Sequence, residues 1–368
     1  MSGATVRPAA VAETYALVAE LPLQVESYSV SPLSHEFTAE FTRRTTVIRL
    51  SGRGEEGVGE DATPTEADQL AFQQATPTLP LSGQWTIDAF SSHLATLDLF
   101  PTPPPHERLR SFRRWAFESA ALDLALRQAG RSLAGVLGRP ARPVTFVNSM
   151  RLVDPPSFDP IGERLAIFPS LRFKLDPTST WDEQLIGKIA ATEAVDTLDL
   201  KSQYPPPFGQ PADPELYERI VRAFPTAWIE DPAITPETWS VLEPHRRRIT
   251  WDAPLRSIAD IEQLATRPLA INIKPVRFGS LQTLFGAYDY CAVNGIAMYG
   301  GGFGELGPGR HHIQYLASLF HPDTPNDVAP SGYNRTKLDP ALPTSPLTAS
   351  PAHTGFRWAP AELHSQRA

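Results

Sequence analysis

Residues 269–274 read LAINIK, a short apolar run that ends in a charge, and runs of this kind recur along the second half of the chain. Amphipathic stretches such as WDEQLIGKIAAT (181–192) separate them. Strands that alternate with helices in this way predict βαβ units and a parallel sheet. The other apolar runs are VTFVNSM (144–150), LRFKL (171–175), TLDLK (197–201), AWIE (227–230), RITWD (248–252) and GIAMY (295–299).

These seven runs, with an eighth near Asn326-Asp327-Val328, favour a closed (β/α)8-type barrel, a modified TIM barrel, over an open sheet. Before Pro143 the pattern differs, because strand-like alternation gives way to clear helical periodicity at 110–130. We therefore expect an α/β protein with two domains. They are an N-terminal α+β capping domain (1–140), joined by the C-terminal tail (335–368), and a barrel domain (141–334).

Most of the predicted strands end in an ionisable residue, although strands that are buried on both faces should be apolar. If a helix follows each strand, all of these groups lie on the C-terminal rim of the barrel, where barrel active sites are built. A single Asp or Lys at a strand end is usually a salt bridge or a helix cap. Five of them in the order lysine, acid, acid, acid, lysine favour a site instead. They are Lys174, Asp199, Glu230, Asp252 and Lys274.

The types of these residues indicate a reaction. Three carboxylates brought together repel one another unless a cation neutralises them, and ligation by oxygen alone suits Mg²⁺. Lys174 and Lys274 would flank the metal from opposite sides, and a nearby cation would lower the pKa of each lysine so that it can act as a base. Such a site can take a proton from the carbon next to a carboxylate and hold the enediolate that forms. Arg172, two residues before Lys174, is expected to point the same way, either to shape the site or to pair with an acid.

With these motifs the chain resembles the enolase superfamily, specifically its muconate-lactonizing-enzyme-like branch. The resemblance covers nearly the whole chain. It implies that Asp199, Glu230 and Asp252 bind Mg²⁺ and that Lys174 and Lys274 are the acid/base groups, as a lysine base with Mg²⁺ is known chemistry of this superfamily. The matching segments are Arg172-Phe173-Lys174, Asp199-Leu200-Lys201, Ile229-Glu230-Asp231-Pro232, Trp251-Asp252 and Asn272-Ile273-Lys274-Pro275.

The mandelate-racemase branch of the same family has a histidine at the end of the seventh strand. Here that run ends in Tyr299, and His311-His312 are expected at a helix start or on its surface. Lys274 on the sixth strand therefore favours the branch with two lysines.

Three positions depart from the family pattern. Arg172 replaces the first lysine of K-x-K, and Ala253 follows Asp252 where an acid is common. Lys201 replaces the customary Asn, and it either binds an anion of the substrate or pairs with Asp199 or Glu230. These departures leave the substrate open.

A glycine-rich stretch, MYGGGFGELGPGR (298–310), contains G-x-G-x-x-G between a strand and a helix, the order of a dinucleotide-binding fingerprint. That fingerprint belongs to the first βα turn, whereas this copy lies in the seventh unit. We expect the glycines to let the backbone turn beside a substrate at the rim and to bring Glu305 to Lys274 or to the substrate. The stretch from Gln24 to Phe37 is expected to leave the first cap strands, either closing over the substrate or forming a plain turn.

Composition narrows the class of protein further. The 368 residues carry a net charge of −8, which argues against nucleic acid or an anionic membrane as the main partner. There is no apolar run long enough to span a membrane and no signal-peptide pattern, and the one cysteine fits a reducing compartment. We predict a cytoplasmic enzyme for a small carboxylate substrate, and a homo-oligomer because relatives often form one.

The first hypothesis for function is Mg²⁺-dependent abstraction of the α-proton of a carboxylate, by a racemase or epimerase of an amino-acid derivative or dipeptide. The second is a lyase of the o-succinylbenzoate-synthase type, or a cycloisomerase. A non-catalytic ligand-binding relative is disfavoured, because both lysines and all three acids are kept. A nucleotide-dependent dehydrogenase is the least favoured.

Overall fold

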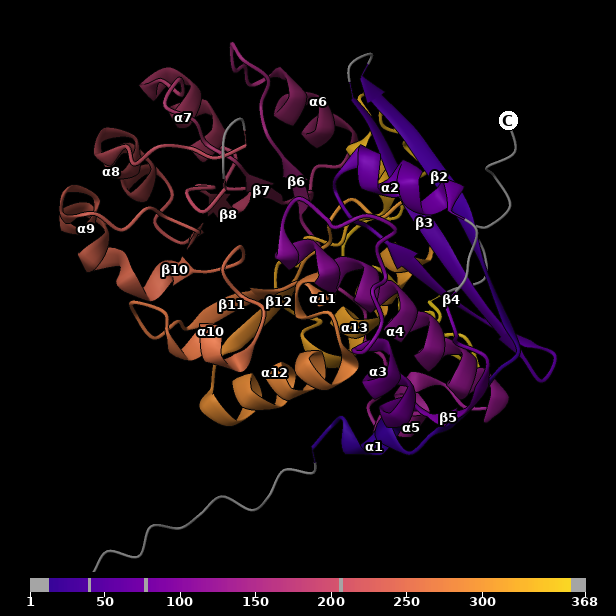
Figure 1. Ribbon diagram of the computed structural model, residues 1–368. Coiled ribbons are helices and arrows are strands. Elements are labelled where there is room, and N and C mark those ends of the chain that lie inside the picture. Colours follow the sequence, from indigo (N-terminus) through magenta and orange to yellow (C-terminus); the bar gives the residue numbers. More distant parts are fainter. Residues whose placement is uncertain (1–12, 39–40, 76–78, 205–207, 359–368) are drawn as a thin grey trace, which may run out of the picture.

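The computed structural model describes residues 13–38, 41–75, 79–204 and 208–358. In it a strand-rich N-terminal unit lies against a ring of parallel strands and helices (Figure 1). The helices of the N-terminal unit are α1 (Ala16–Ala19), α2 (Glu66–Gln74), α3 (Ile87–Leu94), the 3-10 turn η1 (Glu107–Leu109), α4 (Arg110–Gln128) and α5 (Leu133–Leu137). Its strands are β1 (Pro22–Val25), β2 (Ser27–Thr38), β3 (Phe41–Gly52), β4 (Glu55–Asp61) and β5 (Gly83–Thr86).

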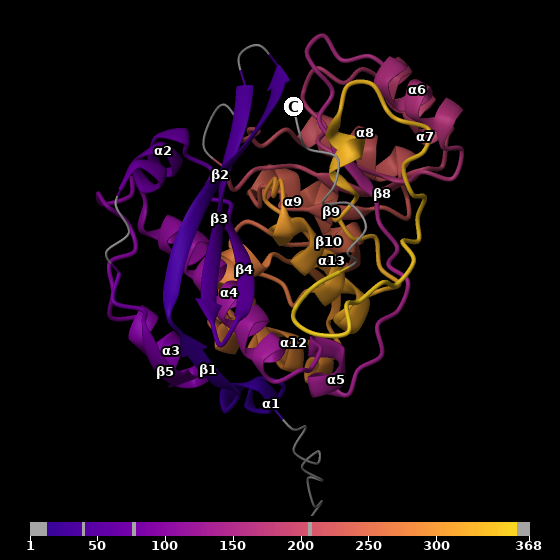
Figure 2. The ribbon, with the colours of Figure 1, turned by 90° about the vertical axis from the view of Figure 1, so that its right-hand side faces the viewer.

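Strands β2, β3 and β4 form an antiparallel sheet that packs on α4 (Figure 2). The sequence EEGVGED of β4 allows this close approach. A Cβ atom on Gly57 would lie 2.2 Å from the carbonyl oxygen of Ala120, and one on Gly59 would lie 1.9 Å from that of Ala116. Glycine at these two positions therefore lets the helix backbone rest directly on the strand.

We expected the stretch from Gln24 to Phe37 to leave the first cap strands, either closing over the substrate or forming a plain turn. The stretch is instead part of two strands. It forms the end of β1, which pairs with β5, and most of β2, which pairs with β3. Alternate residues of β2, such as Tyr28 and Val30, pack against the buried core, and this burial explains why the segment is a strand.

The second unit is a barrel of short parallel strands. Its strands are β6 (Asn148–Met150), β7 (Phe173–Leu175), β8 (Val195–Asp199), β9 (Trp228–Glu230), β10 (Ile249–Thr250), β11 (Ala270–Ile273) and β12 (Ala297–Gly300). Its helices are α6 (Asp159–Ile167), α7 (Glu183–Ala190), α8 (Pro214–Ala223), α9 (Pro236–Leu242), η2 (Glu243–Arg248), α10 (Ile258–Glu262), α11 (Pro275–Phe278), α12 (Leu281–Asn294), α13 (Pro308–Phe320) and η3 (Ser331–Asn334). Strands β6 to β10 pair in chain order, and β11 pairs with β12, all in parallel.

Backbone hydrogen bonds close the ring. The Asn272 N–H donates to the Trp251 carbonyl at 2.9 Å and so joins β11 to the end of β10. The segment predicted as an eighth strand makes the other join, because Asn326 bridges Phe146 and Asp327 bridges Gly301, both in parallel. The predicted (β/α)8-type barrel is confirmed.

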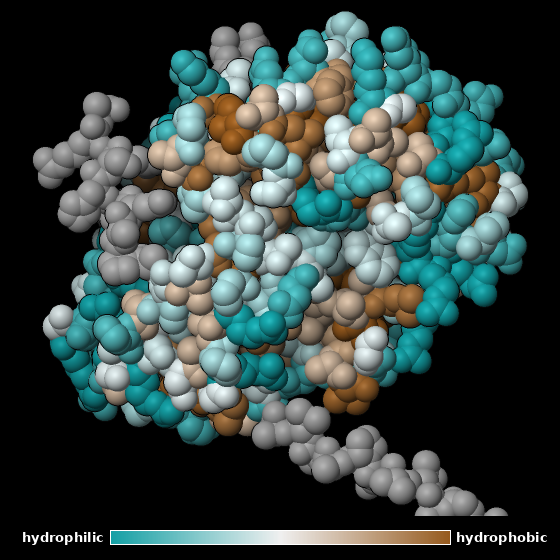
Figure 3. All heavy atoms as spheres, turned by 180° about the vertical axis from the view of Figure 1, so that it is seen from behind, coloured by the Kyte–Doolittle hydropathy of each residue, from teal (hydrophilic) through white to brown (hydrophobic). Residues whose placement is uncertain are grey.

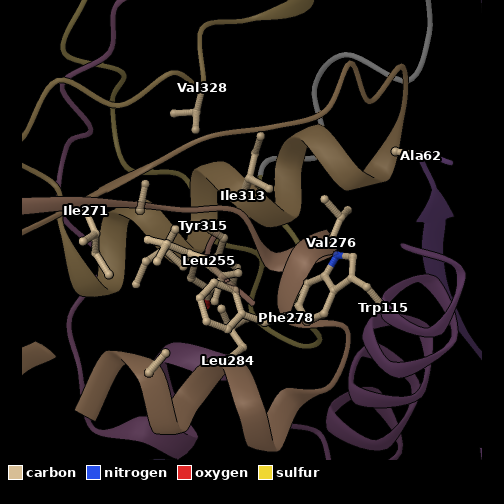
Figure 4. Packing of buried hydrophobic residues seen from close by; sticks show 14 of the residues in the cluster. Ala62, Trp115, Leu255, Ile271, Val276, Phe278, Leu284, Ile313, Tyr315 and Val328 are labelled. Carbon is tan, nitrogen blue, oxygen red and sulfur yellow. The ribbon is translucent and has the colours of Figure 1, made fainter. Parts of the chain in front are cut away.

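The two units share one buried core. Trp115 on α4 and Val276 on α11 belong to the same cluster of buried apolar side chains (Figure 4). The tail contacts both units, since Phe356 N–H donates to Asp123 of α4 at 2.8 Å and Leu347 bridges Val144. A division of the chain near residue 140 stays a prediction.

In the described part of the chain, no helix has the length and apolar character needed to cross a membrane. The face opposite to that of Figure 1 mixes hydrophilic and hydrophobic side chains (Figure 3).

Candidate active site

The five ionisable residues predicted at strand ends come together at one end of the barrel. Lys174 lies within β7, Asp199 and Glu230 are the last residues of β8 and β9, and Asp252 and Lys274 follow β10 and β11. Asp199 and Glu230 are direct partners across the two strands. All five are buried, with Lys274 the most exposed at 6%. Burial of so many charges is costly unless they neutralise one another, so their contacts decide what the site can do.

The three acids form one cluster. Within the described residues, Asp199, Glu230 and Asp252 each present an oxygen atom that lies within 4.8 Å of the others. Lys174 is 3.1 Å from Asp199 and also contacts Glu230. Lys274 lies 2.9 Å from Asp252. The two lysines thus approach the acid cluster from different strands, β7 and β11.

The cluster fits a divalent cation. Burial, followed by the neighbouring carboxylates, raises the pKa of Glu230 to about 8 despite contact with Lys174. The pKa of Asp231 is raised to about 7 for the same reasons. The ionised form of Glu230 is therefore disfavoured in this arrangement, and a cation bound among the three acids would favour it. Three buried carboxylates that offer only oxygen atoms suit Mg²⁺.

The lowered pKa that we expected for Lys174 is not found in this arrangement. Burial by itself lowers the pKa of Lys174, but the carboxylates of Asp199 and Glu230 outweigh it and raise the pKa well above its usual value. A lysine between two carboxylates stays charged, because both stabilise the ammonium form.

Lys201 pairs with acids at the edge of the cluster. Its ammonium group contacts Asp199 and lies 3.6 Å from Asp176, and it is 5.4 Å from the ring centre of Tyr204. Its backbone is left-handed, with φ of 51°. Of the two roles that we considered, pairing with Asp199 is present, and binding of a substrate anion stays a prediction.

Arg277 and Tyr204 complete the surroundings of Asp252, and the strand-end pattern missed both. The Arg277 guanidinium is 3.2 Å from Asp252, donates to the Ala253 carbonyl at 2.8 Å and donates to the Tyr204 hydroxyl at 2.6 Å. The Tyr204 hydroxyl in turn donates to Asp252 at 3.1 Å. Arg277 lies three residues after Lys274, one turn along α11, and this spacing was the signal available in the sequence.

Two further residues hold Glu230 and Asp252 in place. Asp231, which follows Glu230 directly in the chain, accepts the backbone N–H groups of Asp252 and Ala253, both at 2.9 Å. The Tyr299 hydroxyl donates to Glu230 at 2.5 Å. Tyr299 thus contacts the cluster from β12, where the related branch has its histidine.

Arg172 does not join the site. It makes a two-pronged ion pair with Asp196 at 2.7 and 2.5 Å, near the start of β8, whereas Asp199 lies at the end of that strand. Arg172 precedes β7, so the alternation of that strand does not fix its direction, and the pairing of β7 with β8 shifts register between Phe173 and Lys174. Pairing with an acid, the second role considered for Arg172, is the one present.

Glu305 folds back onto its own segment. Its carboxylate accepts the Phe303 N–H at 2.9 and 3.0 Å and lies 3.7 Å from Arg310. Within the described residues, Glu305 makes no ion pair with Lys274. Glu305 also lines a small hollow of about 40 Å³ together with β2 residues that include His35 and with Asn334 of η3. Its role towards a substrate therefore stays a prediction.

His311-His312 were expected at a helix start or on its surface. They lie near the start of α13, but His312 is not on the surface. Its ring is buried and stacks on Phe356 of the tail, with ring centres 4.2 Å apart. Burial lowers the pKa of His312 to about 3, so the ring is a neutral part of the core.

The glycine-rich segment lies against Lys274. A Cβ atom on Gly301 would be 2.6 Å from the Cε atom of Lys274, so no larger residue fits there without displacing the lysine. The Phe303 ring centre is 5.6 Å from the Lys274 ammonium and 5.5 Å from the Arg277 guanidinium. The glycines allow the backbone to lie directly beside a charged side chain of the cluster.

Two family models match the chain. Residues 16–136 match the N-terminal domain, and residues 140–335 the C-terminal domain, of a family described as "Domain of unknown function (DUF8230)". The chain belongs to the DUF8230 family. This DUF8230 protein has the fold of enolase superfamily members, and the predicted resemblance is confirmed.

A solved relative shows the shared fold. The dipeptide epimerase of Methylococcus capsulatus, determined in complex with a magnesium ion, superposes with a TM-score of 0.67 at 17% identity. The match covers 92% of this chain and 99% of that chain. At this identity the likeness establishes the architecture of the DUF8230 protein.

Two curated relatives share sequence with it. An o-succinylbenzoate synthase from Listeria innocua is 35% identical over 88 residues, 23% of this chain and 24% of that protein. An N-succinylamino acid racemase from an Amycolatopsis species is 28% identical over 251 residues, 65% of this chain and 64% of that protein. Each match spans less than two thirds of the curated relative.

Proposed function

We propose that this protein is an enzyme that removes the α-proton of a carboxylate substrate, as a racemase or epimerase of an N-acylated amino acid or a dipeptide. The observation that carries the proposal is the placement of Lys174 and Lys274. The two lysines come from different strands of the barrel, and each contacts the cluster of three acids. Racemisation needs a proton to leave one face of a carbon and another to arrive on the opposite face. Two lysines from different strands meet this need.

Asp199, Glu230 and Asp252 would hold Mg²⁺ in this proposal. When bound, Mg²⁺ would supply positive charge for the carboxylate whose α-proton leaves. Lys174 can release its own proton only when a cation shares Asp199 and Glu230, because these carboxylates otherwise raise its pKa. Arg277 and Tyr204 would orient Asp252.

A second reaction on the same intermediate is β-elimination, as in o-succinylbenzoate synthesis. It is favoured by the 35% identity with the Listeria innocua o-succinylbenzoate synthase, the highest identity of the two curated matches. Elimination needs only one of the two lysines as base, so the racemase is preferred where both are kept.

The test is exchange of the α-proton in D₂O. The protein with Mg²⁺ is incubated with a panel of N-succinyl amino acids, dipeptides and the o-succinylbenzoate precursor, and deuterium is followed by NMR together with optical rotation. Deuterium incorporation with loss of optical activity supports racemisation, and loss of water from the precursor supports elimination. Exchange that survives removal of both lysines, in the Lys174→Ala, Lys274→Ala double variant, would refute the proposed roles.

A further inference from the structure

The glycine-rich segment does bind an anion, but the anion belongs to the capping unit. The carboxylate of Glu60, on β4, is 1% exposed and accepts three backbone N–H groups. These are from Leu306 at 2.6 Å, Gly307 at 2.9 Å and Gly309 at 2.9 Å. Gly309 lies in the first turn of α13, where unpaired N–H groups and the helix dipole favour a negative charge.

Arg43, on the neighbouring strand β3, binds the same segment through its carbonyl groups. Its guanidinium donates to the Phe303 carbonyl at 2.8 Å and to the Gly304 carbonyl at 3.1 Å. It also donates to Ala62 and Thr63 within the capping unit, at 2.7 and 3.1 Å. A planar guanidinium with this many fixed donors connects two backbone segments rigidly.

Residues 301–309, the rim loop, are therefore held at two places by opposite charges from one antiparallel sheet, by Arg43 at residues 303–304 and by Glu60 at residues 306–309. Phe303, whose carbonyl accepts from Arg43, also packs its ring edge-on against Phe112 of α4 with centres 4.8 Å apart. The same ring faces Lys274, and Gly301 at the start of the loop is in contact distance of the Lys274 chain. Lys174, in contrast, is held by Asp199 and Glu230, which do not belong to the loop.

We propose that Arg43 and Glu60 are positioning residues for Lys274. The capping unit sets the place of the rim loop, and the loop sets the place of the Lys274 ammonium relative to the acid cluster. The role of Lys274 in proton transfer rests on the proposed function. The coupling acts on one of the two faces of the reaction, because the ion-pair partners of Lys174 among the described residues, Asp199 and Glu230, lie outside the loop.

The test compares two lysine backgrounds. In Lys174→Ala the exchange depends on Lys274, and in Lys274→Ala it depends on Lys174. Glu60→Gln is added to each, because the amide keeps the shape but turns an N–H₂ group towards backbone donors. With the fastest N-succinyl amino acid or dipeptide of the panel, Glu60→Gln should lower kcat for exchange about 10- to 100-fold in the first background. It should change kcat by less than about threefold in the second.

A matched control is Asp123→Asn. Asp123 is also a buried carboxylate of the capping unit, and it accepts the N–H groups of Val58 at 2.9 Å and Phe356 at 2.8 Å, away from the rim loop. The Asp123→Asn change should lower the stability of the fold without changing the ratio of kcat between the two backgrounds. Equal loss in both backgrounds for Glu60→Gln, or the same asymmetry for Asp123→Asn, would overturn the positioning role.

A second readout separates this inference from the proposed function. Amide hydrogen exchange of the peptide covering 301–309 is measured by mass spectrometry in the otherwise unchanged chain. Glu60→Gln and Arg43→Met should both speed exchange in this peptide, while Asp123→Asn should not. If the wild type exchanges the α-proton of no compound in the panel, the proposed function fails. If Glu60→Gln leaves the protection of the 301–309 peptide unchanged, the anchoring of the loop fails, whatever the α-proton exchange shows.

Discussion

Replacement of Lys201 by asparagine should strengthen magnesium binding. The Lys201 ammonium contacts Asp199, one of the three acids proposed as metal ligands, and lies 3.6 Å from Asp176. A cation on this carboxylate both occupies a lone pair that a metal needs and repels the metal. Asparagine has no charge and a shorter side chain, so Lys201→Asn removes both effects while leaving the three acids in place.

The size of the effect follows from the contact that is lost. A hydrogen bond between charged groups contributes about 1.5–3 kcal/mol, and a metal that displaces the ammonium from Asp199 must forgo this. We therefore expect Lys201→Asn to bind Mg²⁺ about 10- to 100-fold more tightly, since 1.4 kcal/mol corresponds to tenfold. The metal-free variant should melt at a lower temperature than the wild type, because Asp176 and Asp199 lose a neutralising partner.

Both effects can be measured on protein stripped of metal with EDTA. Calorimetric titration gives the dissociation constant of Mg²⁺, and thermal unfolding with and without Mg²⁺ should show a larger rise for the variant. Lys188→Asn makes the same change of net charge at an exposed position on α7 and should leave affinity unaltered. Magnesium binding that is unchanged or weaker in Lys201→Asn would refute the competition between the ammonium and the metal.

Three other changes have defined outcomes. Gly301→Ala should lower α-proton exchange about 10- to 100-fold by displacing Lys274, whereas Gly187→Ala, where a Cβ meets nothing within 4 Å, should not. Because the pKa of His312 is lowered to about 3 in the folded state, the neutral ring contributes stability that is fully present above a pH of about 6.5. This contribution is lost as the pH falls towards the folded pKa. Urea unfolding should therefore show the wild type losing about 2 kcal/mol relative to His312→Met between pH 7.5 and 5. Asp252→Asn should abolish the rise in melting temperature with Mg²⁺, and a retained rise would exclude it as a ligand.

The sequence predicted the barrel and the central cluster because both depend on local pattern. In a parallel barrel every strand end lies on one rim, so a charge at the end of an apolar run is placed in space by its position in the chain. This logic brought Lys174, Asp199, Glu230, Asp252 and Lys274 together without knowledge of any side-chain contact.

Other contacts depend on packing between distant segments, which a pattern does not encode. Arg172 pairs with Asp196 of the neighbouring strand and not with the site, a contact that only the assembled sheet contains. Arg277 and Tyr204 reach Asp252 from a helix and a loop, where strand periodicity gives no signal. His312 is buried by Phe356, a residue of the tail whose return to the barrel cannot be read from the helix itself.

The G-x-G-x-x-G stretch shows what such a motif specifies. Glycines followed by a helix create a turn with free backbone N–H groups, and this geometry favours an anion whatever its source. A phosphate needs an open loop, but Glu60 fills this one from within the same chain. The sequence of β4 indicates this occupant. Gly57 and Gly59 let the strand rest on α4, and Glu60, the residue after Gly59, reaches the first turn of α13 with its carboxylate. In this protein the glycine-rich segment therefore connects the capping unit to the barrel. The ring of Phe303, in the same segment, lies beside Lys274, the lysine that is proposed to move the proton.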